Sequence, residues 1–141
     1  MPLVVRYPEI INGGSATSAL SMNIDFAPTF LDLAGVTIPP DIQGTSFKKI
    51  LEGIVPADWR KAVYYHYYEY PAEHSVKKHY GIRTADTKLI HFYDDIDEWE
   101  MYDLAADPKE MRNIYNDPAY AEKRAEMHSM LEEAREKYKE D

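Results

Sequence analysis

Cationic side chains gather in one segment of an otherwise acidic chain. The formal net charge of the chain is -9, yet the segment from Glu73 to Lys88 contains more basic than acidic residues: His74, Lys77, Lys78, His79, Arg83 and Lys88 against Glu73 and Asp86. Concentrated positive charge attracts and steers anionic ligands. This segment is therefore a candidate binding site for an anionic ligand, and the alternative is a solvated loop with ordinary surface lysines.

Three other basic residues have a structural explanation. Arg83 lies inside an expected strand, where its planar guanidinium predicts a buried, hydrogen-bonded structural arginine. His66 lies among tyrosines without a second ligand at metal spacing, which favours a core histidine. His128 falls in an expected charged helix and is predicted to be solvated. We predict no catalytic residue among them.

The acidic residues do not form a recognisable catalytic pair. Asp25 is suited to cap a helix, and Asp103 to accept hydrogen bonds at the end of a strand. Asp32 is a third candidate acid, but no two carboxylates are placed for glycoside hydrolysis. The acidic run from Asp94 to Glu98 lacks a recognised calcium-loop pattern, so we predict no metal site in this chain.

Composition excludes several classes of protein. The 141 residues are enough for one ordinary domain, and the acidic net charge argues against nucleic acid or an anionic membrane as partner. Cysteine is absent, which excludes disulfides, thiolate zinc sites and a cysteine nucleophile. No apolar run approaches the roughly 20 residues of a membrane-spanning helix.

The first third of the chain predicts short elements. Leu3 to Tyr7 reads as a buried strand, and Phe26 to Ala34 as a helix with Asp25 as its N-cap and Gly35 as its stop. Phe26, Phe30, Leu33 and Ala34 would form the apolar face of that helix. A second short helix is expected from Ser46 to Leu51, ended by Gly53.

The remainder predicts an α+β arrangement. Four antiparallel strands are expected at 62–70, 80–84, 88–93 and 99–104, with a turn at 85–87 and an acidic turn at 94–97. Asp107-Pro108 and Asp117-Pro118 each resemble a helix start. The second of them begins a long helix to Tyr138, whose apolar stripe would lie on one face of the sheet. The tyrosines of 62–70 favour a half-buried sheet face over a sugar-stacking platform.

Three groups of residues together resemble the C-terminal region of type I sulfatases, arylsulfatase-like members of the alkaline-phosphatase superfamily. They are 23–35 (NIDFAPTFLDLAG) with 43–46 (QGTS), 80–84 (YGIRT) with 88–90 (KLI), and 99–104 (WEMYDL) with Asp107, Pro108, Glu110 and Asn113. Their order and spacing cover most of the chain. The resemblance implies that 1–53 is the end of an α/β catalytic domain and that 54–141 is the smaller C-terminal subdomain.

The resemblance also implies what this chain lacks. Sulfatases use a formylglycine made from a Cys or Ser in a Cys/Ser-X-Pro-Ser/Ala-X-Arg motif, and this sequence contains no such motif. Their calcium ligands also have no counterpart here. We therefore expect a fragment without catalytic residues, inactive alone, whose parent enzyme would use formylglycine and calcium. The parent would hydrolyse sulfated carbohydrate and be periplasmic or secreted, with His74, and Lys77 or His79, contacting the sugar.

Two other interpretations remain open at this point. Phosphodiesterases and phosphonate monoester hydrolases of the same superfamily have similar C-terminal regions. The chain could also be a stand-alone sugar-binding or protein-binding module. Unpaired backbone at Leu3 to Tyr7 would favour self-association in a chain separated from the catalytic domain, its expected main partner.

Overall fold

The computed structural model describes residues 2–139, which form two compact units divided between Arg60 and Lys61. The expected domain boundary after residue 53 stays a prediction. Trp59 and Arg60 belong to the first unit because the Trp59 indole N–H donates to the Leu20 carbonyl and the Arg60 guanidinium binds Asp25.

The first unit contains three short helical elements. They are the 3₁₀ turn η1 (Asn23–Asp25), the helix α1 (Phe26–Leu33) and the single-turn helix α2 (Lys48–Leu51). The positive φ angles at Gly35 (68°) and Gly53 (88°) confirm both glycine stops. The second helix is shorter than expected because Ser46 lies outside it, where its hydroxyl accepts from the Lys48 N–H and donates to Asp32.

The expected strand at Leu3 to Tyr7 is wrong. The structure has no strand there, and Val4 is 89% exposed. A run of β-branched residues becomes a strand only when another strand satisfies its backbone groups, and no such partner exists among residues 2–139. Self-association through this segment stays a prediction.

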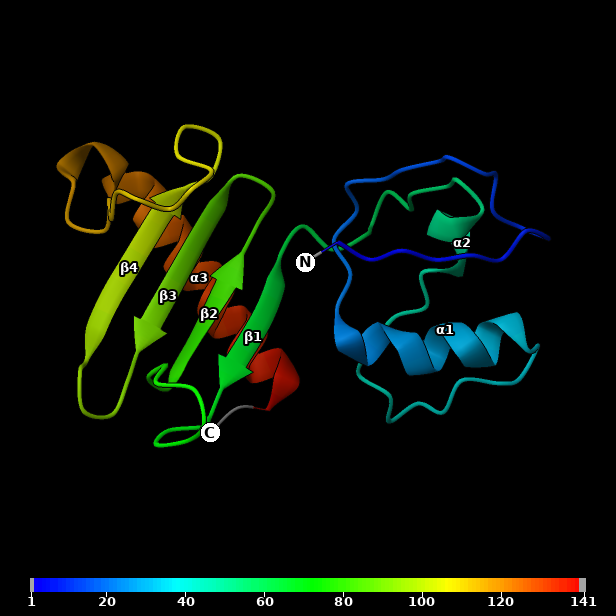
Figure 1. Cartoon of the computed structure of the whole chain (residues 1–141), viewed down its shortest axis with the longest axis horizontal. Coiled ribbons are helices and arrows are strands. Elements are labelled where there is room, and N and C mark those ends of the chain that lie inside the picture. Colours follow the sequence, from blue (N-terminus) through cyan, green and yellow to red (C-terminus); the bar gives the residue numbers. More distant parts are fainter. Residues whose placement is uncertain (1, 140–141) are drawn as a thin grey trace. The chain divides into compact units, whose positions relative to one another are not determined.

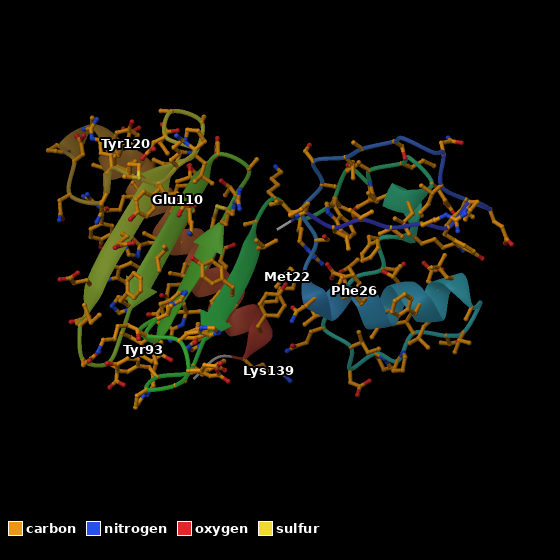
Figure 2. The ribbon with its side chains drawn as sticks, viewed as in Figure 1. Met22, Phe26, Tyr93, Glu110, Tyr120 and Lys139 are labelled. Atoms are coloured by element: carbon orange, nitrogen blue, oxygen red, sulfur yellow. The ribbon has the colours of Figure 1, made fainter. Side chains whose placement is uncertain are left out.

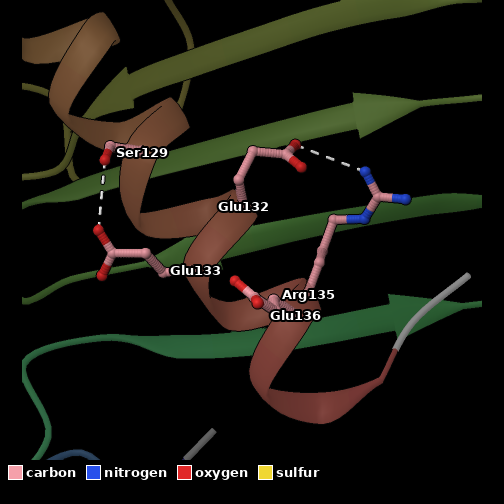
Figure 3. Close-up of a pocket in the computed structure, with 5 residues that line it drawn as sticks. All are labelled: Ser129, Glu132, Glu133, Arg135 and Glu136. Carbon is pink, nitrogen blue, oxygen red and sulfur yellow. Dashed lines mark hydrogen bonds and ion pairs between the residues drawn. The ribbon is translucent and has the colours of Figure 1, made fainter.

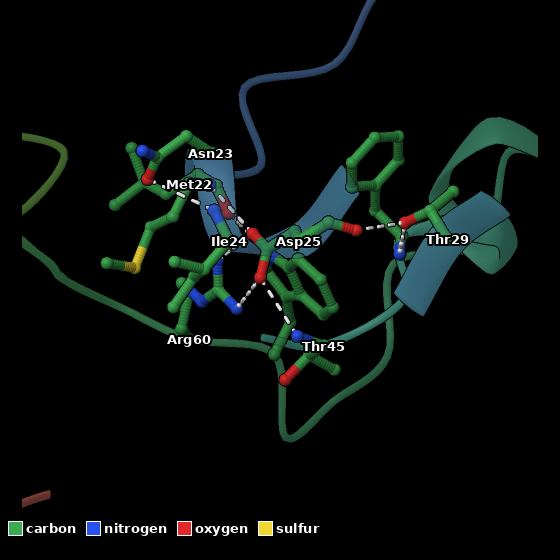
Figure 4. A network of polar contacts seen from close by, with 10 residues as sticks. Met22, Asn23, Ile24, Asp25, Thr29, Thr45 and Arg60 are labelled. Atoms are coloured by element: carbon green, nitrogen blue, oxygen red, sulfur yellow. Dashed lines mark hydrogen bonds and ion pairs between the residues drawn. The ribbon is translucent and has the colours of Figure 1, made fainter. Parts of the chain in front are cut away.

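Asp25 is a buried junction and not the expected side-chain cap of α1. Its carboxylate is fully buried, makes no capping bond to α1, and accepts the N–H groups of Met22 (2.7 Å) and Thr45 (2.9 Å). Both terminal nitrogens of Arg60 also donate to it. Figure 4 shows these donors converging on one side chain. Asp25 therefore joins segments distant in the sequence.

The expected apolar face of α1 is also wrong. Its buried residues are Pro28 and Thr29, whereas Phe30 is 66% exposed and stacks on Phe26. The Thr29 hydroxyl explains the orientation, because it donates to the Asp25 carbonyl and accepts the Phe47 N–H. Gly44 is needed for a steric reason, because a Cβ atom at this position would overlap the Ile24 carbonyl.

The second unit confirms the predicted four-stranded antiparallel sheet. Its strands are β1 (Val63–Tyr67), β2 (His79–Arg83), β3 (Thr87–Phe92) and β4 (Glu98–Asp103), in the spatial order β1-β2-β3-β4 (Figure 1). In such a meander the β1–β2 and β3–β4 connections lie at one end of the sheet. The β1 strand ends at Tyr67, earlier than expected, because pairing with β2 ends at the Tyr67–His79 pair.

The long helix α3 (Ala121–Tyr138) covers one face of this sheet, as predicted (Figure 1). Met127 and Leu131 are completely buried in a cluster that includes Ile82, Leu89 and Met101. Burying each such side chain stabilises the fold by about 1.5–3 kcal/mol. The 3₁₀ turn η2 (Pro118–Tyr120) precedes α3, and the Asp117 carboxylate caps it through the Ala119 N–H.

The expected helix at Asp107-Pro108 is wrong. The segment is a turn in which the Asp107 carboxylate accepts the N–H groups of Met111 (2.7 Å) and Arg112 (2.8 Å). Glu110 has a φ of 55°, outside the helical region, and its carboxylate binds Lys88 at 2.6 Å. A tertiary contact thus overrides a local helix signal.

Replacing Asp25 with Ala should destabilise the first unit by about 3–5 kcal/mol, because the Arg60 charge would remain buried without its partner. Urea unfolding followed by Trp59 fluorescence, in a Trp99→Phe background, measures the loss. Exposed Asp41 provides the control, and Asp41→Ala should change stability little. Equal effects of the two substitutions would contradict the assigned role of Asp25.

Replacing Met127 with Ala should cost the second unit about 2–5 kcal/mol through lost burial and a residual cavity. Met111, which is 81% exposed, provides a matched control. Met111→Ala should leave the urea midpoint, monitored by Trp99 fluorescence, nearly unchanged. If Met127→Ala behaved like this control, the assignment of the core would be wrong.

Candidate functional site

The three predicted binding residues lie in different settings. His74 is exposed in the connection between β1 and β2, and it forms no hydrogen bond or ion pair with any residue in 2–139. Lys77 lies where this connection approaches β2. His79 is the first residue of β2, and its ring packs between Tyr67 and Phe92. Only His74 presents an uncommitted side chain.

Lys77 is held by two groups. Its ammonium lies 2.5 Å from the Asp95 carboxylate and 3.7 Å from the centre of the Tyr70 ring. The Asp95 hydrogen bond and, after it, Tyr70 raise the pKa of Lys77 above its usual value. The same bond lowers the pKa of Asp95 below 3.8. The charge of Lys77 is therefore balanced within the fold.

Lys78 forms a second ion pair beside the first. Its ammonium binds Asp94 at 3.0 Å, and this hydrogen bond raises the pKa of Lys78. The Tyr93 N–H donates to the Lys78 carbonyl at 3.3 Å. Tyr93, labelled in Figure 2, lies at the end of the sheet that carries the β1–β2 connection. The sequence contains both the basic pair at 77–78 and the acidic pair at 94–95, but it does not show that they bind each other. They do so because the fold places both at the same end of the sheet.

The cationic segment does not form one continuous patch. Lys77 and Lys78 lie at one end of β2, whereas Arg83 lies at the other, roughly 17–20 Å away at about 3.3 Å per residue. Lys88 pairs with Arg83 across the strands and binds Glu110. The predicted burial of Arg83 is wrong, because its side chain points from the face opposite α3 and is exposed.

The tyrosines of β1 divide between the two faces of the sheet. Tyr64 belongs to the core beneath α3. Tyr65 lies across β2, where a Cβ on Gly81 would meet its hydroxyl at 2.6 Å. Burial raises the pKa of Tyr65 strongly, and Glu110 and Glu100 add to this effect. The hydroxyls of Tyr65 and Tyr67 are buried without a partner among residues 2–139, so these rings act as packing groups.

The histidines on the α3 face are packing residues. His66 binds the Tyr93 hydroxyl at 2.7 Å, which agrees with its predicted structural role. The predicted solvation of His128 is wrong, because its ring lies 4.4 Å from the Trp99 ring centre. Burial, followed by the charge of Arg124, lowers the pKa of His128. Helix periodicity predicts which face of α3 packs on the sheet, but it does not show that the Trp99 indole covers His128.

The described carboxylates have structural roles. Asp103 accepts the Ala105 and Ala106 N–H groups, as its predicted turn role requires. Within residues 2–139, no three histidine or carboxylate side chains are grouped to hold a metal ion. These residues therefore do not fit a calcium site. In the same residues, no helix has the length and apolar character needed to cross a membrane.

A recess on the outward side of α3 offers no better site. It is lined by Ser129, Glu132, Glu133, Arg135 and Glu136 (Figure 3). Its residues form hydrogen bonds with one another along the helix. The Ser129 hydroxyl donates to Glu133 at 3.3 Å, and the Arg135 guanidinium donates to Glu132 at 3.4 Å. This is an acidic solvated helix face, so the connection that carries His74 remains the candidate.

The Lys77–Asp95 pair should be visible in a titration. The carboxyl pKa of Asp95, followed by carbon-detected NMR, should lie below 3.8 and return toward it in Lys77→Met. The folded state lowers the pKa of Asp95. The stabilisation of the fold by the ion pair is therefore complete above the usual carboxyl pKa, and it is lost as pH falls through the lowered pKa of Asp95. An unchanged Asp95 titration in Lys77→Met would contradict the pairing.

Comparison with known proteins agrees with this architecture. The chain matches the family described as N-sulphoglucosamine sulphohydrolase, C-terminal, over residues 1–137. It is 67% identical to an N-acetylglucosamine-6-O-sulfatase of Bacteroides thetaiotaomicron, over 99% of this chain and 25% of the relative. The chain thus spans about a quarter of the length of that relative.

Two solved structures have the same fold. One, a complex with its substrate D-glucosamine-2-N,6-O-disulfate, superposes with a TM-score of 0.93 at 65% identity, covering 96% of this chain and 28% of that one. The other is a phosphonate monoester hydrolase from Silicibacter pomeroyi, with a TM-score of 0.74 at 26% identity, covering 89% and 27%. The family match over residues 1–137, together with the four-stranded sheet and its helix, identifies this chain as a member of the sulfatase C-terminal family.

Proposed function

We propose that this chain is the C-terminal region of a sulfatase that hydrolyses the 6-O-sulfate ester of a glucosamine-type sugar. The observation that carries the proposal is the 67% identity, over 99% of the chain, to an N-acetylglucosamine-6-O-sulfatase. The structure at 65% identity was solved with a 6-O-sulfated glucosamine as its substrate, which supports the same sugar class. The phosphonate monoester hydrolase has lower identity, 26%.

The role of this chain in that enzyme is to shape the substrate site. Formylglycine and calcium would be supplied by the catalytic domain, the main partner of this chain, because residues 2–139 do not group ligands for a metal. We therefore expect the isolated chain to lack sulfatase activity. The sheet and α3 would support the β1–β2 connection, which presents His74 to solvent.

His74 is the residue that we propose to contact the sulfated sugar. Its imidazole is exposed and forms no interaction with other described residues, so both ring nitrogens remain available to a ligand. Imidazole can donate to a sugar hydroxyl or a sulfate oxygen and can gain positive charge near neutral pH. His79 is less suited to this role, because its Nδ1 bonds the Lys77 carbonyl at 2.8 Å.

The function can be tested on the protein encoded by the gene that carries this chain. Sequencing upstream of the Met1 codon should reveal an in-frame Cys/Ser-X-Pro-Ser/Ala-X-Arg motif. The expressed full-length protein should release sulfate from N-acetylglucosamine-6-sulfate faster than from a 2-O-sulfated uronate. Preferred hydrolysis of a phosphonate monoester, or a gene without that motif, would overturn the proposal.

In the full-length enzyme, His74→Ala should raise KM several-fold and leave kcat nearly unchanged. The loss of one hydrogen bond to substrate costs about 1 kcal/mol, which corresponds to roughly a fivefold effect. Ser75→Ala changes the neighbouring exposed residue and should leave both constants unaltered. An unchanged kcat/KM in His74→Ala would remove His74 from the binding site.

A further inference from the structure

The connection between β1 and β2 is closed at its base by contacts between its two ends. Tyr70 follows the end of β1, and Lys77 precedes the start of β2. The Lys77 ammonium lies 3.7 Å from the centre of the Tyr70 ring, which brings these ends together. The residues between them, 71–76, form a short exposed loop that contains His74. Compact loops with closed ends often carry function.

The closed base is also tied to the β3–β4 turn. Asp95 binds Lys77 at 2.5 Å, and Asp94 binds Lys78 at 3.0 Å. The β3–β4 turn reaches the base of the loop through a left-handed backbone conformation at Asp94, which has a φ of 75°. Two adjacent ion pairs therefore join the base of the loop to a turn on the same end of the sheet.

These contacts change what Lys77 can do for an anionic ligand. A lysine that binds a sulfate directly needs an ammonium free of competing carboxylates. Lys77 instead has Asp95 at 2.5 Å, and the side chains of Lys77 and Asp95 are 27% and 53% exposed. The local positive charge expected from the sequence is therefore largely cancelled by Asp95 where the loop ends. The pKa of Lys77 is raised, as expected for an engaged ammonium.

We propose that Lys77 and Asp95 form a latch that positions the 71–76 loop for the sulfated sugar, and that Lys77 does not contact the sulfate itself. This inference rests on the proposed function for its substrate. The latch keeps the loop closed before the sugar arrives, so binding does not have to pay for ordering it. Lys77 and Asp95 are thus positioning residues.

The direction of the KM change in one variant distinguishes the latch from a direct contact between Lys77 and the sulfate. Asp95→Asn in the full-length enzyme removes a negative charge beside Lys77. If Lys77 bound the sulfate directly, the freed ammonium would lower KM for N-acetylglucosamine-6-sulfate. The latch predicts the opposite, a KM raised about threefold to tenfold with kcat retained. A lowered or unchanged KM would overturn the proposal.

Further variants control for charge and geometry. Glu98→Gln removes the same charge at an exposed position close in sequence, where no ion pair exists among the described residues, and should leave KM unchanged. Lys77→Arg keeps a cation for both Asp95 and the Tyr70 ring and should leave KM nearly unchanged, whereas Lys77→Met should raise KM as Asp95→Asn does. An equal rise in KM for Lys77→Arg and Lys77→Met would also overturn the latch.

Hydrogen–deuterium exchange tests the latch without any activity. In the 141-residue chain, the Tyr93 amide, whose N–H donates to the Lys78 carbonyl beside the latch, should exchange several-fold faster in Asp95→Asn than in the unsubstituted chain or Glu98→Gln. Equal rates would overturn the latch even if the sulfatase assignment holds. Conversely, faster exchange in a protein without sulfatase activity would support the loop closure and overturn only its proposed use in sugar binding.

Discussion

The packing of α3 on the sheet is the interaction on which the second unit depends. Met127 and Leu131 have no exposed surface, and neither do Leu89 and Met101 beneath them. An antiparallel sheet buries one face well only if another element covers it. This contact stabilises the meander. It therefore also stabilises the end of the sheet at which the β1–β2 and β3–β4 connections lie together. The candidate site is therefore a consequence of the core, although no core residue belongs to it.

Charge balance at the shared end of the sheet changes the meaning of the basic segment. Four acidic residues in the 94–98 region lie close in sequence, and two of them bind the lysines at the base of the β1–β2 connection. Arg83 and Lys88 lie at the opposite end of the sheet, and His79 is packed against Tyr67, which leaves His74 as the exposed basic residue of the connection. A site for an anionic sugar here would thus rely on a positioned histidine more than on a broad positive potential.

The first unit is organised by a buried polar junction and not by an apolar helix face. The Asp25 carboxylate is shielded from water but has four N–H donors, which offset the cost of its burial. Thr29 continues the network to the Phe47 N–H, so the helix α1 presents its polar residue inward. The phenylalanines of α1 are left on the surface of the described chain, as is Val4.

The sequence by itself determined the four strands and α3 of the second unit and the glycine stops of the first, because alternation, helix periodicity and turn chemistry are local properties. The family followed from the groups of residues that resemble type I sulfatases. The sequence placed the four strands and α3 within a few residues, and the Asp103 turn and the structural role of His66 were also correct. Only the tertiary structure decided the rest. Leu3 to Tyr7 is not a strand, since strand formation needs a partner. Arg83 is exposed and His128 is covered, because burial depends on which face another element occupies. The pairing of Lys77 with Asp95 could not be read from the chain, since 18 residues separate them and only the meander brings them to one end of the sheet.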